Sequence, residues 1–154
     1  MGVFGMEWSH VLFSILYFFK FVLAITVIAL YGIDVDRTRK AADGHVDGKW
    51  VYALVVATLS AVTAVLYLIP AILRHRIVPI WSFIIFILWI ALFGIFGKMF
   101  IDRDPKGNQD VQRMKNAVWV DLANALLWLI GTGAAAAYWW SKSRVTRWTG
   151  RANV

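Results

Sequence analysis

The sequence contains no cysteine, and charged residues make up only 16% of its 154 positions. Without thiols the chain has no disulfide, no cysteine nucleophile and no cysteine-ligated metal site. The low charge also excludes an ordinary water-soluble domain, because such a domain covers its core with polar surface. Hydrophobic residues account for 60% of the chain. They occur in runs longer than a buried helix needs, which predicts a small polytopic membrane protein.

Four apolar runs are each long enough to cross the hydrocarbon core of a bilayer, which is about 30 Å thick. Lipid offers no partner to an exposed peptide group, so we expect each run to be helical. The predicted spans cover residues 11–32, 50–73, 80–101 and 117–140. The predicted fold class is therefore all-α, a four-span transmembrane antiparallel bundle. It forms a single membrane domain over residues 1–154 that ends in a basic tail at 141–154.

The charges of the connectors give two conflicting indications of orientation. Four spans place both termini on one side, and the two longer loops on the other side carry more lysine and arginine, which favours the cytoplasm for those loops. The tail, however, has no acidic residue and suits the anionic lipid of an inner leaflet. The predicted anionic-lipid contacts in this tail are Lys142, Arg144, Arg147 and Arg151.

Small residues recur at helical spacing in three of the spans. Helices that already lie in lipid associate through close backbone approach and polar contacts, so such residues mark packing faces. The predicted packing residues are Ala53, Ala57, Ala61, Gly94, Gly97, Gly131, Gly133 and Ala135. We expect them to pack helices of one chain together, and the alternative is an interface between copies of the chain.

Asp121 is a carboxylate about one turn inside the fourth span. It shares a helical face with Asn124, Trp128 and Thr132, so this face is expected to line the bundle interior. Lys98, near the end of the third span at similar depth, is the predicted ion-pair partner. The pair would clamp two helices together. The alternative is a proton or ion relay, which would need polar groups across the whole bilayer.

Lys20 lies near the middle of the first predicted span. Its long side chain allows the ammonium group to snorkel toward the terminal side, which is the favoured interpretation. No acidic residue lies at a plainly matching depth. The alternative is therefore a buried charge that meets a substrate or a lipid headgroup.

The groups that catalysis needs are missing from the spans. His10, His45 and His75 fall at span ends or in connectors, so the facing mid-span histidines of a haem-binding bundle are absent. No helix presents cysteine or paired acidic residues either. We therefore expect no catalytic residue, no metal site and no cofactor, and conclude that the chain is not an enzyme.

Three stretches resemble a known family. They are residues 19–32 (FKFVLAITVIALYG), 81–98 (WSFIIFILWIALFGIFGK) and, above all, 114–130 (MKNAVWVDLANALLWLI). On these the chain resembles a fungal member of the MARVEL-type tetraspan proteins, small four-helix membrane proteins with short loops. Two features depart from that pattern. Several animal relatives carry a cysteine pair that this chain lacks, and Lys20 stands where a neutral residue would be more comfortable.

The resemblance implies a role in membrane organisation without catalysis. It implies lateral association, formation of lipid domains and trafficking at the plasma membrane or an endomembrane, with cytoplasmic termini. The implied partners are membrane lipids and further copies of the chain or other membrane proteins, and no nucleic acid. The alternative is a small transporter or channel that uses Asp121. Small multidrug resistance transporters have comparable length, but they need a carboxylate in the first helix, where this chain has Lys20.

Overall fold

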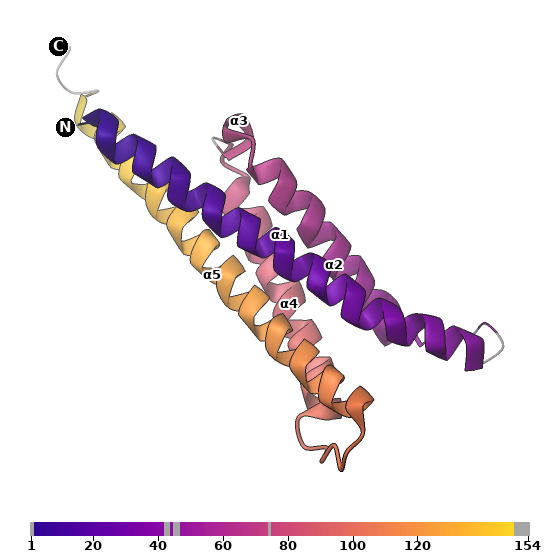
Figure 1. Cartoon of the computed structure of the whole chain (residues 1–154). Helices are drawn as coiled ribbons and strands as arrows, with labels where there is room; N and C mark the ends of the chain where they lie inside the picture. Colours follow the sequence, from indigo (N-terminus) through magenta and orange to yellow (C-terminus); the bar gives the residue numbers. More distant parts are fainter. Residues whose placement is uncertain (1, 42–43, 45–46, 74, 150–154) are drawn as a thin grey trace.

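The protein is built from four long helices and one short helix. The computed structural model describes residues 2–41, 44, 47–73 and 75–149, and no strand occurs among them. Figure 1 shows the arrangement. The helices are α1 (Gly2–Ala41), α2 (Gly48–Tyr67), α3 (Pro70–Leu73), α4 (Val78–Phe100) and α5 (Gln109–Thr149). The predicted all-α four-helix bundle is confirmed.

The four long helices are each long and apolar enough to cross a membrane. The shortest, α2, has 20 residues, which corresponds to about 30 Å of helix and thus to one hydrocarbon core. Many large apolar side chains point outward from the bundle, as lipid requires and water would oppose. The protein is therefore an integral membrane protein with four candidate spans.

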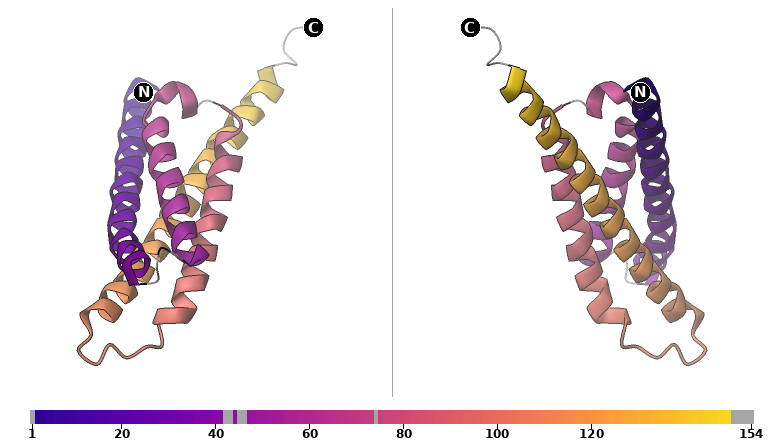
Figure 2. Two further views of the ribbon diagram at one scale, coloured as in Figure 1. Left: turned by 90° about the vertical axis from the view of Figure 1, so that its right-hand side faces the viewer. Right: turned by 90° about the vertical axis from the view of Figure 1, so that its left-hand side faces the viewer.

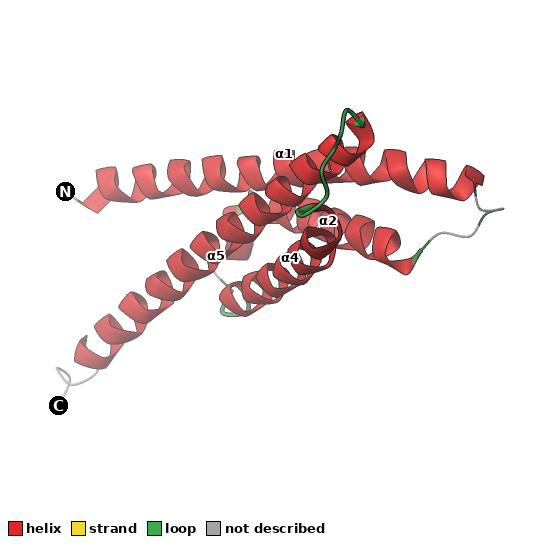
Figure 3. Ribbon diagram, turned by 90° about the horizontal axis from the view of Figure 1, so that it is seen from below, coloured by secondary structure: helices red, strands yellow, loops and turns green. Residues whose placement is uncertain are grey.

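The helices pair as two hairpins. α1 packs against α2, and α4 packs against α5. The contact between α1 and α5 joins the hairpins, and a smaller contact links α2 to α4. Figures 2 and 3 show that α5 is inclined to α1, so the two helices diverge toward the end where both chain termini lie. The α1–α5 contact is thus closest in the other half of the bundle.

The second predicted span, 50–73, is too long. α2 ends at Tyr67, and a separate short helix, α3, begins at Pro70. Proline has no N–H to donate, and its ring clashes with the carbonyl group four residues earlier, so a helix ends before it. The proline therefore closes the second crossing and turns the chain toward α4.

The first and last helices extend well beyond their predicted spans. α1 continues from the predicted end at residue 32 to Ala41, and α5 begins at Gln109 rather than at residue 117. The Oδ1 atom of Asn108 accepts a hydrogen bond from the backbone N–H of Asp110 at 3.0 Å, a typical N-cap that starts α5 early. The ends of both helices carry charged residues past the apolar run, so polar groups of α1 and α5 meet outside it.

The core contains both tryptophans that lie in the middle of spans. Trp89 and Trp128 are fully buried. The indole N–H of Trp89 donates to Ser60 at 2.7 Å, and Tyr52 donates to the carbonyl group of Leu88 at 3.1 Å. These bonds connect α2 to α4 and satisfy polar groups that lipid would leave unpaired.

Candidate functional site: a polar seam between α1 and α5

Lys20 is fully buried between aromatic rings. Its Nζ atom lies 4.3 Å from the ring centroid of Tyr17 and 4.1 Å from that of Trp128 on α5. The ring of Tyr67 completes the surround by meeting Tyr17 edge-on at a centroid distance of 5.2 Å. Nζ has no hydrogen-bond partner among the described residues. The snorkelling prediction is therefore wrong, because the ring faces attract the cation into the bundle instead.

Gly131 provides the space for this ammonium group. A Cβ atom at position 131 would overlap the Nζ atom of Lys20 and would also touch Leu16. Gly131 was predicted as a helix-packing residue, and it does allow close approach. What approaches it, however, is a side chain from α1 and not a helix backbone.

Asp121 is also fully buried, and its partner is Tyr31. The hydroxyl group of Tyr31 on α1 donates to the Oδ2 atom of Asp121 at 2.6 Å. A hydrogen bond to a carboxylate is stronger than one between neutral groups, and burial protects it from competition by water. The bond therefore links α1 to α5 in the interior of the bundle.

The predicted ion pair between Lys98 and Asp121 does not form. Lys98 is exposed on the outer surface of α4, whereas its neighbour Gly97 is buried against α5, with Val118 about van der Waals distance from a Cβ placed there. One residue turns a helix by about 100°, so the position after Gly97 points away from α5. The two residues match in depth but not in rotation.

The predicted polar face of α5 is only partly internal. Asn124 and Trp128 are fully buried. The Oδ1 atoms of Asn124 and Asp121 and the Nε1 atom of Trp128 have no hydrogen-bond partner in the described part of the chain. Thr132 is half-buried and donates to the carbonyl group of Trp128 in its own helix at 2.8 Å, so it adds nothing to the contact between helices.

Beyond the apolar run, the same two helices are held by ion pairs. Arg113 of α5 lies 2.6 Å from Asp34 of α1, and both side chains are mostly buried. Arg37 pairs with Asp110 at 2.7 Å in a more exposed position. We call the contacts made by Lys20, Tyr31 and Asp34 with Trp128, Asp121 and Arg113 the polar seam.

The polar seam follows a regular antiparallel register, which sequence analysis missed. Lys20 precedes Tyr31 by eleven positions on α1, and Gly131 follows Asp121 by ten positions on α5. One known contact between two antiparallel helices fixes the others at equal steps in opposite directions. The signal was therefore present in the spacing, but it becomes readable only after α1 and α5 are known to be neighbours.

The predicted small packing residues divide into two groups. Five are buried within the bundle, and their predicted use in packing one chain is confirmed for them: Ala53, Ala57, Ala61, Gly97 and Ala135. Gly94 and Gly133 instead lie exposed on the outer surface, and a Cβ atom at either position would meet nothing within 4 Å. They take no part in packing between the described helices.

The basic tail continues α5. Lys142 and Arg144 are exposed, and each cation lies over an indole ring, of Trp139 and of Trp140 respectively. The side chain of Arg147 and the whole of Arg151 lie outside the part of the chain that the structure describes. The predicted lipid contact at these four positions stays a prediction.

Comparison with known proteins adds no relative: no family model, no curated protein and no solved structure matches this chain. The class of the protein is thus defined by its own fold, as a four-span integral membrane protein with a buried polar seam. The resemblance to MARVEL-type proteins continues as a proposal.

Proposed function

We propose that the protein organises membranes as a non-catalytic, self-associating tetraspan of the MARVEL type. The observation that carries this proposal is the outward position of Gly94 and Gly133. Small residues on the lipid-facing side of a span let the backbone of another helix approach closely. The other small residues are consumed by packing inside the bundle, but these two are available to a second copy.

The position of the charges supports a structural role. Lys20 and Asp121 are both enclosed by protein, and both contact aromatic side chains across the α1–α5 boundary. Such contacts hold two hairpins in one arrangement and leave an apolar outer surface for lipids and for neighbouring membrane proteins. A bundle that is fixed internally and smooth externally suits lateral association.

Native mass spectrometry of gently extracted protein tests self-association. Gly94→Leu and Gly133→Leu are expected to shift the protein from oligomer to monomer, because each leucine would hold a second helix away. Gly32→Leu is the matched control, since a side chain at Gly32 also meets open space. A protein that is monomeric before substitution would contradict the proposal, and so would an oligomer that both leucine variants leave intact.

We further propose cytoplasmic termini in a fungal plasma membrane or endomembrane. The absence of native cysteine makes the test direct, because a single introduced cysteine is the only thiol to label. On intact cells with the protein at the surface, a membrane-impermeant maleimide is expected to label Lys106→Cys in the loop and to spare Arg144→Cys in the tail. Labelling of the tail alone would reverse the orientation.

A second candidate function is transport or conduction through the polar seam. The favouring observation is that Oδ1 of Asp121 and Oδ1 of Asn124 are buried without partners, as groups that bind a passing ion or proton would be. Asp121→Asn keeps an acceptor for Tyr31 but removes the charge. Proteoliposome flux that Asp121→Asn abolishes would favour transport, and the absence of flux in the unmodified protein would favour the organising role.

A further inference from the structure

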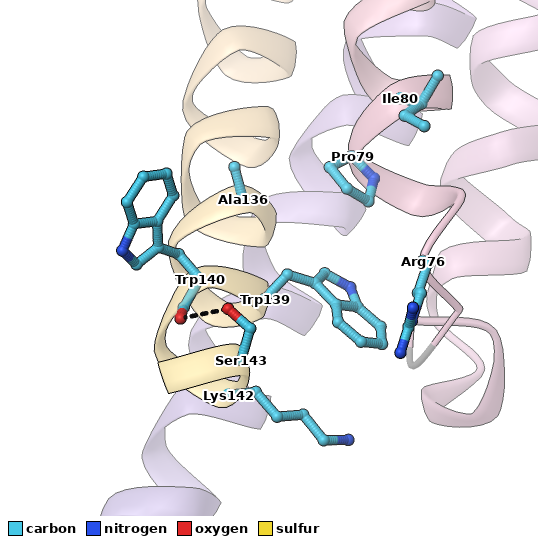
Figure 4. Close-up of a pocket in the computed structure, with 8 residues that line it drawn as sticks. All are labelled: Arg76, Pro79, Ile80, Ala136, Trp139, Trp140, Lys142 and Ser143. Carbon is cyan, nitrogen blue, oxygen red and sulfur yellow. Dashed lines mark hydrogen bonds between the residues drawn. The ribbon is translucent and has the colours of Figure 1, made fainter. Parts of the chain in front are cut away.

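A pocket of about 540 Å³ lies between the beginning of α4 and the end of α5. Figure 4 shows the side chains that line it. Its apolar wall is formed by Pro79, Ile80 and Ala136, and its polar wall by Arg76, Trp139 and Lys142. Its volume falls in the range of about 300–1,000 Å³ that is typical of small-molecule sites. The pocket is therefore large enough to hold part of a lipid.

Two cations meet at one ring in this pocket. The guanidinium carbon of Arg76 lies 5.7 Å from the ring centroid of Trp139, and Nζ of Lys142 lies 5.4 Å from the same centroid. Figure 4 shows both side chains reaching toward this indole. Like charges held close together repel, and an anion placed near both removes that cost. The arrangement therefore favours a negatively charged occupant.

The chain supplies no carboxylate for this position. None of the described residues that line the pocket is acidic, and neither the connector 70–79 nor the tail from residue 141 contains aspartate or glutamate. The indole Nε1 of Trp139 is buried without an acceptor in the described part of the chain. Two cations and a hydrogen-bond donor thus converge on a pocket whose own groups include no anion.

The depth of the pocket identifies the kind of anion. Ile80 and Trp140 are the last residues of two predicted apolar runs, so the pocket lies where hydrocarbon gives way to headgroups. The apolar wall faces the hydrocarbon side, whereas Arg76 and Lys142 lie toward the polar side. An occupant that matches both walls has an anionic head and an apolar chain.

We propose that this pocket binds one anionic phospholipid. Arg76 and Lys142 contact its phosphate, Trp139 donates to a headgroup oxygen, and an acyl chain lies along Ile80 and Ala136. The assignment rests on the proposed membrane-organising role and deepens it by naming the lipid class. It also differs from a general attraction of the tail, because Arg76 comes from the α3–α4 connector and not from the tail.

Native mass spectrometry after reconstitution in phosphatidylcholine and phosphatidylglycerol tests the site. The unmodified protein is expected to retain one phosphatidylglycerol in preference to phosphatidylcholine. Arg76→Gln and Lys142→Gln are each expected to weaken this retention about fivefold, the effect of one basic residue close to an anionic membrane surface. Both residues lie at the surface, so we expect both variants to fold, and circular dichroism provides the check.

Arg144→Gln is the matched control, because Arg144 lies on the same tail but contacts Trp140 and does not line the pocket. It is expected to change retention less than either pocket variant does. Equal losses for Arg144→Gln and Arg76→Gln would overturn the site in favour of diffuse attraction. Displacement of the lipid by inorganic phosphate would also overturn it, because the pocket would then bind a free anion.

Lipid retention and self-association are measured separately in the same spectra. Loss of retention in the pocket variants with an unchanged oligomer supports the lipid site, whatever the origin of the oligomer. An oligomer that persists while no lipid is retained by the unmodified protein overturns the lipid site and leaves the proposed function standing.

Discussion

The ammonium group of Lys20 on α1 occupies the place where a side chain at position 131 of α5 would begin. A charge in the interior of a membrane bundle is costly, and here two ring faces and a glycine accommodate it. The residue that first looked like an exception to a lipid-facing helix is therefore part of the contact that joins the two hairpins.

Gly131→Ala is expected to destabilise the bundle. The added methyl group overlaps Nζ of Lys20, whose escape is blocked by the rings of Tyr17 and Trp128, and overpacking of this kind costs about 1–3 kcal/mol. Unfolding in mixed detergent micelles measures the loss. Gly133→Ala is the control, since a Cβ there meets open space. Equal stability of the two variants would show that Lys20 is not at Gly131.

Lys20→Met is expected to stabilise the protein. Methionine has a similar length and no charge, and replacing a buried group that has no ion-pair partner by an apolar side chain removes its desolvation cost. The gain is expected to be about 1–3 kcal/mol in free energy of unfolding. A lower midpoint for Lys20→Met in a urea or detergent titration would instead mean that the cation–π contacts outweigh desolvation.

Asp121→Ala is expected to reduce stability, whereas Lys98→Ala is not. Removing the acceptor leaves the hydroxyl group of Tyr31 buried without a partner, at a cost of about 1–3 kcal/mol. Asp121→Asn is expected to cost less because its amide oxygen still accepts. Resistance to proteolysis in micelles provides the measurement. If Lys98→Ala matched Asp121→Ala, the ion pair rejected above would be restored.

Arg113→Ala is expected to loosen the outer end of the polar seam. Asp34 would be left mostly buried without its partner, and breaking a partly buried pair costs about 1–3 kcal/mol after allowance for its remaining solvent contact. Lys40→Ala breaks an exposed pair with Asp36 and is the control, with an expected change within about 0.5 kcal/mol. Thermal unfolding followed by tryptophan fluorescence separates the two, and similar shifts would contradict the assigned burial of the Arg113–Asp34 pair.

Depth along the membrane was predictable from the sequence, but rotation about each helix was not. Runs of apolar residues locate a span and set the level of Asp121 and Lys98, which the prediction matched correctly. Spans that are apolar on every side carry little indication of which side faces inward. Lys98 was therefore paired with Asp121 by depth alone, although Gly97 is the residue that faces α5.

The helix ends show the same limit from another direction. Pro70 is a recognised helix breaker, so the end of α2 could have been predicted, whereas the run of apolar residues through Leu73 concealed it. The early start of α5 depends on Asn108 as a cap, and a short polar segment does not indicate by composition whether it is a loop or a helix. The ion pair of Asp34 with Arg113 follows from these extensions and from the register of α1 against α5.

Oxidative disulfide formation is the most direct test of the central claim, that the charged groups of the spans meet at the α1–α5 boundary. Two double variants of the naturally cysteine-free chain are compared in membranes: Tyr31→Cys with Asp121→Cys, and Lys98→Cys with Asp121→Cys. The account predicts that the first pair forms an intramolecular disulfide and that the second does not. A disulfide between positions 98 and 121, with none between 31 and 121, would contradict it.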